Sequence, residues 1–113
     1  MPISNSTMQT HTFLTEMYGD DYFPDFLVDK CKQILVSLCE QIESTKPSDN
    51  ESLLRLTHAA VDSLNQLEAE FEENESEIET AARDALGDEF HAILHAYGFG
   101  EVEVDDAIAN RDW

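Results

Sequence analysis

Two histidines in one predicted helix have a spacing that suits metal binding. In the segment DALGDEFHAILHAYGF, His91 and His95 are four positions apart. Asp84 and Asp88 fall on the same stripe, because positions four apart lie on one side of a helix. Imidazole and carboxylate groups bind zinc and nickel, so these four side chains form a candidate metal site. The HxxxH spacing is weak evidence by itself, and it is also typical of a solvent-facing helix surface.

The motifs of established catalytic sites are missing from the sequence. The zincin motif HExxH, the two Glu-x-x-His pairs of di-iron bundles and the Gly-x-Ser-x-Gly elbow do not occur. There is no phosphate-binding loop and no dinucleotide fingerprint. Cys31 and Cys39 fall on an apolar helix stripe, where a thiolate is disfavoured. We therefore expect no catalytic activity and no cofactor.

An acidic run, EAEFEENESEIETAARD, covers residues 68–84. Its glutamates are Glu68, Glu70, Glu72, Glu73, Glu75, Glu77 and Glu79. On a helix, one side would carry Glu68, Glu72, Glu75 and Glu79. Another side would carry Glu70, Glu73 and Glu77. Each pair of like charges four positions apart lowers the stability of a helix by about 0.2–0.5 kcal/mol. The run thus predicts a binding surface for a basic partner. A solvated corner between two helices is the main alternative, and calcium binding is weaker because no EF-hand loop is present.

A second candidate contact lies in the turn segment GDDYFPD. It places Asp20 and Asp21 beside the aromatic residues Tyr22 and Phe23. Aromatic side chains next to carboxylates can anchor an arginine or a lysine of a partner. The alternative interpretation is that the aromatic residues only close one end of a helical bundle.

The overall charge limits the classes of partner. The 113 residues include 25 acidic and 6 basic side chains, which gives a formal charge of −19. Such a charge repels nucleic acid and anionic membranes and attracts basic proteins or cations. Solubility alone requires a magnitude of only about 2–8, although acidic proteins of halophiles also reach high values. We expect no direct contact with nucleic acid.

The first residues, MPISNSTMQTH, lack the features of a secretory signal, and no stretch approaches the ~20 apolar residues of a membrane span. Cys31 and Cys39 are eight positions apart on one predicted helix, about 12 Å along its axis, which is too far for a disulfide. Two reduced thiols suit a cytoplasmic protein.

Hydrophobic spacing predicts an all-α fold: a compact bundle of three main helices with short helical segments at both ends. The first long helix is expected over residues 24–45. The second begins with a Ser48–Glu51 capping box, and the third begins with a Ser76–Glu79 capping box and stops at Gly98. We expect a break near Asn74, because one unbroken helix over residues 48–97 would be about 75 Å long. Residues 1–9 are predicted to form a flexible N-terminal arm, and residues 10–113 a single helical domain.

Four stretches carry a resemblance to a known family: FLVDKCKQILVSLCEQIE, FEENESEIETAARDAL, HAYGF and NRDW. From about residue 13 onward, the chain resembles a family of small uncharacterised bacterial proteins known only as a domain of unknown function. The resemblance implies no activity, ligand or site residue.

The sequence therefore favours a non-catalytic acidic protein that docks a basic partner protein. Immunity proteins, antitoxins and other inhibitors or regulators work in this way. True mimicry of nucleic acid is less favoured, because the glutamates point in two directions. The alternative function is divalent-metal binding by the Asp/His stripe.

Overall fold

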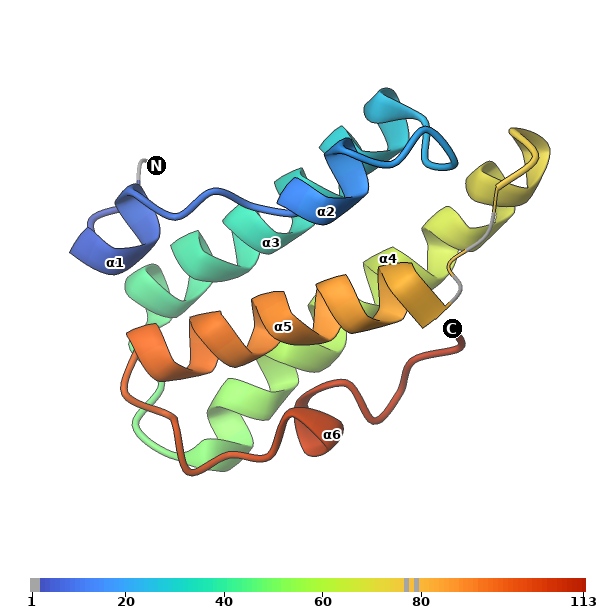
Figure 1. Cartoon of the computed structure of the whole chain (residues 1–113). Coiled ribbons are helices and arrows are strands. Elements are labelled where there is room, and N and C mark those ends of the chain that lie inside the picture. Colours follow the sequence, from blue (N-terminus) through green and yellow to red (C-terminus); the bar gives the residue numbers. More distant parts are fainter. Residues whose placement is uncertain (1–2, 77, 79) are drawn as a thin grey trace.

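Two long antiparallel helices, α3 (Asp25–Thr45) and α4 (Asn50–Glu73), form the centre of the protein (Figure 1). The computed structural model describes residues 3–76, 78 and 80–113. The connection between the two helices is short because Lys46 adopts a left-handed conformation (φ 49°) and Pro47 follows it. The pair packs along most of its length, as expected for helices joined by a tight turn.

The third main helix, α5 (Thr80–Ala96), lies across this pair (Figure 1). Three short helices complete the chain: α1 (Ser6–Gln9) and α2 (Thr15–Tyr18) contact α5 from one side, and α6 (Val104–Ala107) packs against α4 and α5 from the other. The described part of the chain contains no strand, which confirms the predicted all-α bundle of three main helices. Its radius of gyration is 13.5 Å, as expected for a single compact domain of this length.

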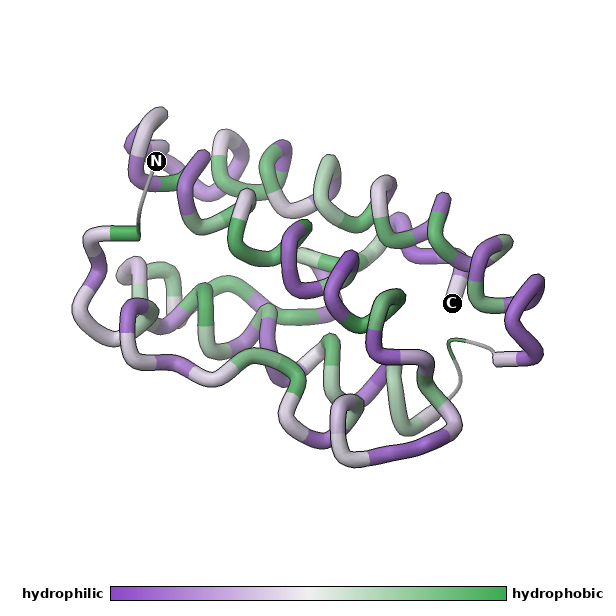
Figure 2. The backbone as a smooth tube through the Cα atoms, turned by 90° about the horizontal axis from the view of Figure 1, so that it is seen from above, coloured by the Kyte–Doolittle hydropathy of each residue, from purple (hydrophilic) through white to green (hydrophobic). Residues whose placement is uncertain are grey.

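The core follows the predicted apolar stripes. Hydrophobic and hydrophilic positions alternate around each long helix, as amphipathic helices require (Figure 2). The largest fully buried side chains include Leu35 of α3, Phe71 of α4 and Phe90 of α5. Trp113 is also buried, so the C-terminal residues return to the bundle. No helix within the described residues has the length and apolar character to cross a membrane.

Residues 3–9, the described part of the predicted N-terminal arm, include helix α1 and contact the bundle, and residues 1 and 2 lie outside the described residues. Asn5 caps α1 by accepting hydrogen bonds from the backbone N–H groups of Thr7 and Met8. Its side-chain amide donates to the carbonyl of Ala96 at 2.9 Å, and Met8 is buried. One buried apolar side chain and one helix cap hold this short segment on the bundle. A segment this short shows no hydrophobic periodicity, so its sequence pattern does not predict these contacts.

The predicted helix starts need correction. Asp49, not Ser48, caps α4, and its carboxylate accepts from the backbone N–H of Ser52 at 2.7 Å. Aspartate and serine cap equally well, so the sequence does not decide between neighbours. The third helix begins at Thr80 rather than at Ser76, and Glu79 of the predicted capping box lies outside the described residues.

The predicted break near Asn74 is confirmed, because α4 ends at Glu73. The backbone N–H of Ser76 donates to the carbonyl of Phe71, and that of Glu75 donates to Glu72. These two bonds form a Schellman motif, with Glu75 in the left-handed conformation (φ 58°). The chain therefore turns away from α4 in the middle of the acidic run.

Candidate partner-binding site

The turn segment before α3 is held in one conformation by its own hydrogen bonds. The Asp20 carboxylate accepts from the backbone N–H of Tyr22 at 2.9 Å, and the Asp20 carbonyl accepts from the N–H of Phe23 at 3.1 Å. Aspartate commonly orders turns in this way. Pro24 then caps the start of α3, so the aromatic residues are fixed at the end of a rigid helix.

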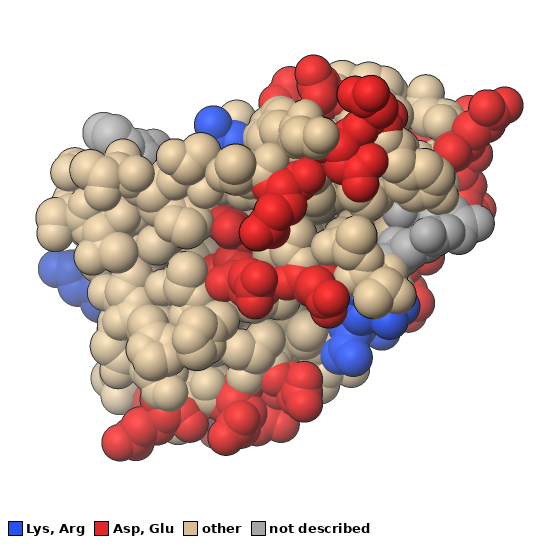
Figure 3. Space-filling view, in the orientation of Figure 1, with Lys and Arg blue, Asp and Glu red and all other residues tan. Residues whose placement is uncertain are grey.

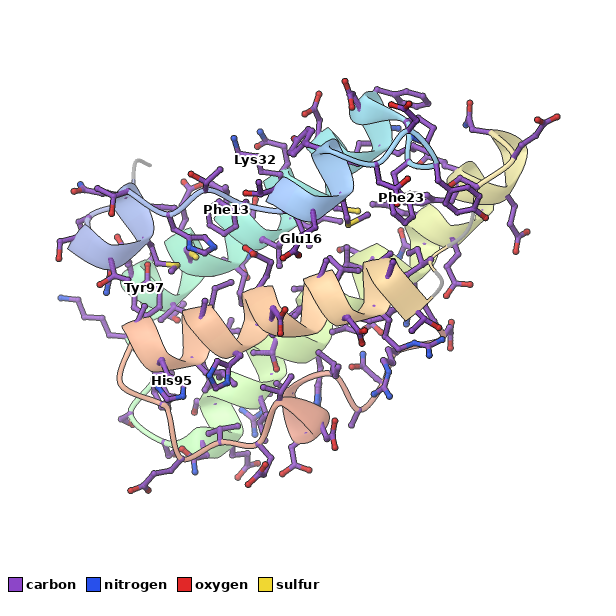
Figure 4. The ribbon with its side chains drawn as sticks, viewed as in Figure 1. Phe13, Glu16, Phe23, Lys32, His95 and Tyr97 are labelled. Carbon is purple, nitrogen blue, oxygen red and sulfur yellow. The ribbon has the colours of Figure 1, made fainter. Side chains whose placement is uncertain are left out.

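Phe23 brings this turn to the end of α4. Its ring is buried and packs edge-on against Phe71, with the centroids 6.4 Å apart. Figure 4 shows Phe23 pointing from the turn toward the bundle. The prediction that aromatic residues close this end of the bundle thus applies to Phe23. The same contact brings the turn that carries Asp20 and Asp21 to the last turns of α4.

Two aromatic side chains at this end remain exposed. Tyr22 is 42% exposed and Phe26 is 49% exposed, and they are the only large hydrophobic residues classed as exposed in the described chain. The ammonium group of Lys30 lies 6.0 Å from the centre of the Phe26 ring and also forms an ion pair with Glu70. Lys30 therefore links the exposed ring on α3 to the acidic run on α4.

We call this end of the molecule, where the turn before α3 meets the last turns of α4, the acidic–aromatic end. We use the name for the side chains that these two elements carry there: Asp20, Asp21, Tyr22, Asp25, Phe26, Lys30, Glu70 and Glu73. Figure 3 shows acidic side chains at the end of the molecule where this turn and the end of α4 lie, and further acidic side chains across the middle and along the lower edge of the same face. The surface combines negative charge with exposed aromatic area, which are the two features that bind basic side chains.

The acidic run divides between two sides of α4, as its spacing predicted. Glu70 faces α3, where it pairs with Lys30. Glu68 and Glu72 instead line a recess beside the C-terminal residues. Glu75 lies in the turn after the helix. Glu77 and Glu79 were also predicted to contact a partner, and both lie outside the described residues.

The predicted metal stripe is exposed, and its members lie in different surroundings. Asp84, Asp88 and His91 line a groove of about 690 Å³ between α5 and α6. The rings of His91 and His95 are 4.3 Å apart, but His95 points toward the loop after α5 (Figure 4). No group of three potential ligand residues in the described part of the chain is arranged to hold a metal ion.

The thiols of Cys31 and Cys39 are not suited to act as nucleophiles. Cys31 and Cys39 are free and buried. Burial raises the pKa of Cys31 to about 12 and that of Cys39 to about 11. Both groups are therefore protonated at neutral pH, as small apolar side chains of a core would be.

Sequence reasoning missed Phe26 and Lys30. Phe26 precedes the apolar stripe of α3 by one position, so a helical projection would place it outside the core. The partner of Lys30 is 40 residues away in sequence, and no local pattern predicts that contact.

A family comparison covers nearly the whole chain. Residues 7–113 match the model of a family of unknown function, DUF5713, and the chain belongs to this family. No curated protein and no solved structure matches the chain.

Proposed function

We propose that this protein is a non-catalytic binding protein that docks a basic partner protein through its acidic–aromatic end. The observation that carries the proposal is the exposure of Tyr22 and Phe26 at the end of the molecule where the acidic turn and the acidic end of α4 meet, with Lys30 as the one basic residue beside Phe26. Exposed aromatic residues are common anchors of interfaces, and surrounding carboxylates steer a basic protein toward them. The high net charge adds a long-range attraction to the same class of partner.

The local structure of this end supports a role in binding. Glu75 adopts a left-handed conformation that side chains other than glycine and asparagine rarely take. The last turns of α4 also carry only acidic charges, although the C-terminal end of a helix favours positive charge. Such departures from local preference are expected at functional sites. Two free thiols are consistent with a reducing compartment, so we expect the protein to act in the cytoplasm.

The test is capture of partners from cells of the source organism with four forms of the protein as bait. The Y22A/F26A variant removes the aromatic anchors and keeps the charge. The D20N/D21N/E73Q variant keeps the aromatic residues and removes three charges. The control, E101Q/E103Q, removes two exposed charges from the loop between α5 and α6, at the opposite end of the molecule.

We expect one basic protein to be retained by the wild type and the control and to be lost from both variants of the acidic–aromatic end. The loss of affinity should be about tenfold or more for Y22A/F26A, since interface aromatics often contribute at least 1–2 kcal/mol, roughly. The effect of the charge variant should shrink as salt approaches about 1 M, where the screening length is near 3 Å. Retention by all four forms, or equal loss from the control, would contradict the proposal.

A further inference from the structure

One side of the α3–α4 pair carries a groove of about 260 Å³ between the two helices. We call this side the outer face, and the groove lining includes Gln33, Ile34, Ser37, Gln41, Ala59 and Ser63. Ser37, Ala59 and Ser63 are exposed, so no described element of the chain covers the groove. The outer face is therefore a helical surface without a partner among the described residues.

The lining of this groove is uncharged, which is unusual in so acidic a protein. It consists only of amide, hydroxyl and apolar side chains, although the chain has 25 acidic and 6 basic residues. The groove between α5 and α6, by comparison, is lined in part by Arg83, Asp84, Asp88 and Arg111. Two copies of a chain with a formal charge of −19 repel each other, so they associate most easily through a surface that adds no further repulsion. The outer face meets this condition.

The two ends of the outer face differ in charge. At the hairpin turn, one helical turn beyond the groove, a recess is lined by Lys46 and Arg55 and by no carboxylate. Arg55 is paired with Glu51, whereas Lys46 forms no ion pair with a described residue. At the opposite end, α3 begins with Asp25 and with the exposed ring of Phe26. A free cation thus lies at one end, and a carboxylate beside an aromatic ring lies at the other.

Two-fold symmetry brings these unlike ends together in one orientation. In an isologous contact, each copy uses the same surface, so the direction of the axis decides which ends meet. An axis parallel to the helices would bring each end against its own copy. An axis that crosses the helices at right angles near Ser37 instead places the turn of Lys46 over the start of α3 of the second copy. Lys46 then faces Asp25 and Phe26, which attract a cation by charge and through the aromatic ring.

The same axis matches the groove residues with one another. Gln33 and Gln41 each lie four positions from Ser37, so Gln33 of one copy lies opposite Gln41 of the other. An amide both donates and accepts, so this pair can form reciprocal hydrogen bonds. The half-buried side chains of Ile34 and Leu56 add apolar area at the groove. The outer face is therefore complementary to itself in polarity as well as in charge.

The size of the outer face predicts a weak contact. The 21 residues of α3 give it a length of about 31 Å at 1.5 Å per residue. Two packed helices present a surface about 20 Å wide, so each copy would bury roughly 600 Å². The total of about 1,200 Å² equals the lower limit of specific interfaces, which corresponds to a Kd in the micromolar range.

We propose that the outer face of the α3–α4 pair binds the same face of a second copy of this chain, with the helices of the two copies antiparallel. The contact covers Phe26, so a dimer would compete with the basic partner for the acidic–aromatic end. That consequence rests on the proposed function, whereas the self-association can be measured with the chain alone.

The test is sedimentation velocity of the full chain over a series of micromolar concentrations at low and high salt. We expect the dimer fraction to rise with protein concentration. It should also rise as salt approaches about 1 M, because the repulsion between two strongly acidic chains is then screened over about 3 Å. The docking of a basic partner has the opposite dependence on salt, so the two kinds of contact are distinguished by its sign.

Three variants locate the contact. S37E places one carboxylate from each copy beside the axis and should weaken the dimer at least tenfold. K46E removes the attraction between unlike ends and should weaken it a few-fold. The control, A109E, adds the same charge as S37E at an exposed position of the C-terminal segment and should leave the dimer unchanged. All three positions are exposed, and circular dichroism of each variant checks that the fold is intact.

The proposal would be overturned by a monomer at every concentration and salt, by association that weakens with salt, or by equal loss in S37E and A109E. Failure of this proposal can be distinguished from failure of the docking function. If Y22A/F26A loses the captured partner while the wild type stays monomeric, docking stands and the dimer is wrong. If the wild type dimerises through the outer face and Y22A/F26A keeps every partner, the dimer stands and the docking surface is wrong.

Discussion

The ends of α4 and α5 use the same backbone motif with different residues. After α5, the N–H of Phe99 donates to the carbonyl of Leu94, and Gly98 adopts the left-handed conformation (φ 82°). After α4, the corresponding positions are Ser76 and Glu75. Glycine takes this conformation without steric cost, whereas a side chain with a Cβ costs roughly 1–2 kcal/mol.

The hydrogen bonding around the two helix ends also differs. At the end of α5, the carbonyl of Ala96 accepts from Asn5, and the hydroxyl of Tyr97 donates to Glu43. At the end of α4, the hydroxyl of Ser76 is buried without a partner in the described structure. The backbone groups at the end of α4 are bonded, and the Asn74 side chain donates to the carbonyl of Glu70, so the difference is confined to the Ser76 hydroxyl and the conformation of Glu75. The contrast indicates that the end of α5 is built for stability, while the end of α4 retains strain where a partner is proposed to bind.

The largest expected effect comes from removing the carboxylate that joins the α5 end to the N-terminal residues. E43Q keeps the shape of the side chain but loses the charge that accepts from Ser4, Asn5 and Tyr97. We expect a loss of about 1–2 kcal/mol in the free energy of unfolding, because hydrogen bonds to charged groups are stronger than neutral ones. Urea denaturation measures it, and S4A is the matched control that removes a single hydroxyl donor.

The pH dependence of stability gives this prediction a signature. The pKa of Glu43 is lower in the folded protein, at about 2, than its ordinary value of 4.5. Its contribution is therefore complete above about pH 4.5 and is lost as the pH falls toward 2. The stabilities of wild type and E43Q should converge over that interval. A difference that stays constant down to pH 2 would contradict the role assigned to the carboxylate.

The next effect tests the glycine at the α5 end. A Cβ added at Gly98 meets no atom within 4 Å, so any cost of G98A comes from the backbone conformation alone. We expect G98A to lower the free energy of unfolding by about 1 kcal/mol. G98N should cost less, because asparagine tolerates the left-handed region. Equal stability of G98A and wild type would remove the basis of the comparison.

The smallest effect is a gain at the α4 end. E75G should raise the free energy of unfolding by about 0.5–1 kcal/mol, since glycine relieves the strained conformation. E75Q removes the charge and keeps the Cβ. Its free energy of unfolding should therefore rise less than that of E75G, because only the like-charge repulsion is relieved. If both variants are equally stable, the strain at Glu75 is not significant. Thermal or urea denaturation measures both.

The periodicity of the sequence predicted the long helices well, because apolar residues at three- and four-residue spacing have one consistent interpretation. The stop at Gly98 and the break after Glu73 are confirmed. The sequence did not reveal how residues 3–9 are held, since one cap and the single buried side chain of Met8 leave no periodic signal. It also did not separate Ser48 from Asp49 as a cap.

The candidate sites could be predicted only in part. Spacing correctly placed Asp84, Asp88, His91 and His95 on an exposed face, but it does not determine whether side chains converge on one point. The acidic run and the turn segment were recognised separately. Their proximity depends on the contact of Phe23 with Phe71, which no local pattern encodes. The recess of Glu68 and Trp113 requires the path of the C-terminal residues, which spacing alone cannot give.

Asn110 donates to the carbonyl of His58 and accepts from the side chain of Asn65, and these bonds hold the C-terminal segment on α4 and affect when it folds. They join residues 45–52 positions apart, whereas α3 and α4 are joined by residues 46–49 alone. Closing a long loop costs more entropy than closing a short one, so the helical hairpin forms early and the segment docks late. Contacts made late mainly slow unfolding. The segment is thus expected to open locally before the hairpin does, and its amide hydrogens should exchange with solvent sooner.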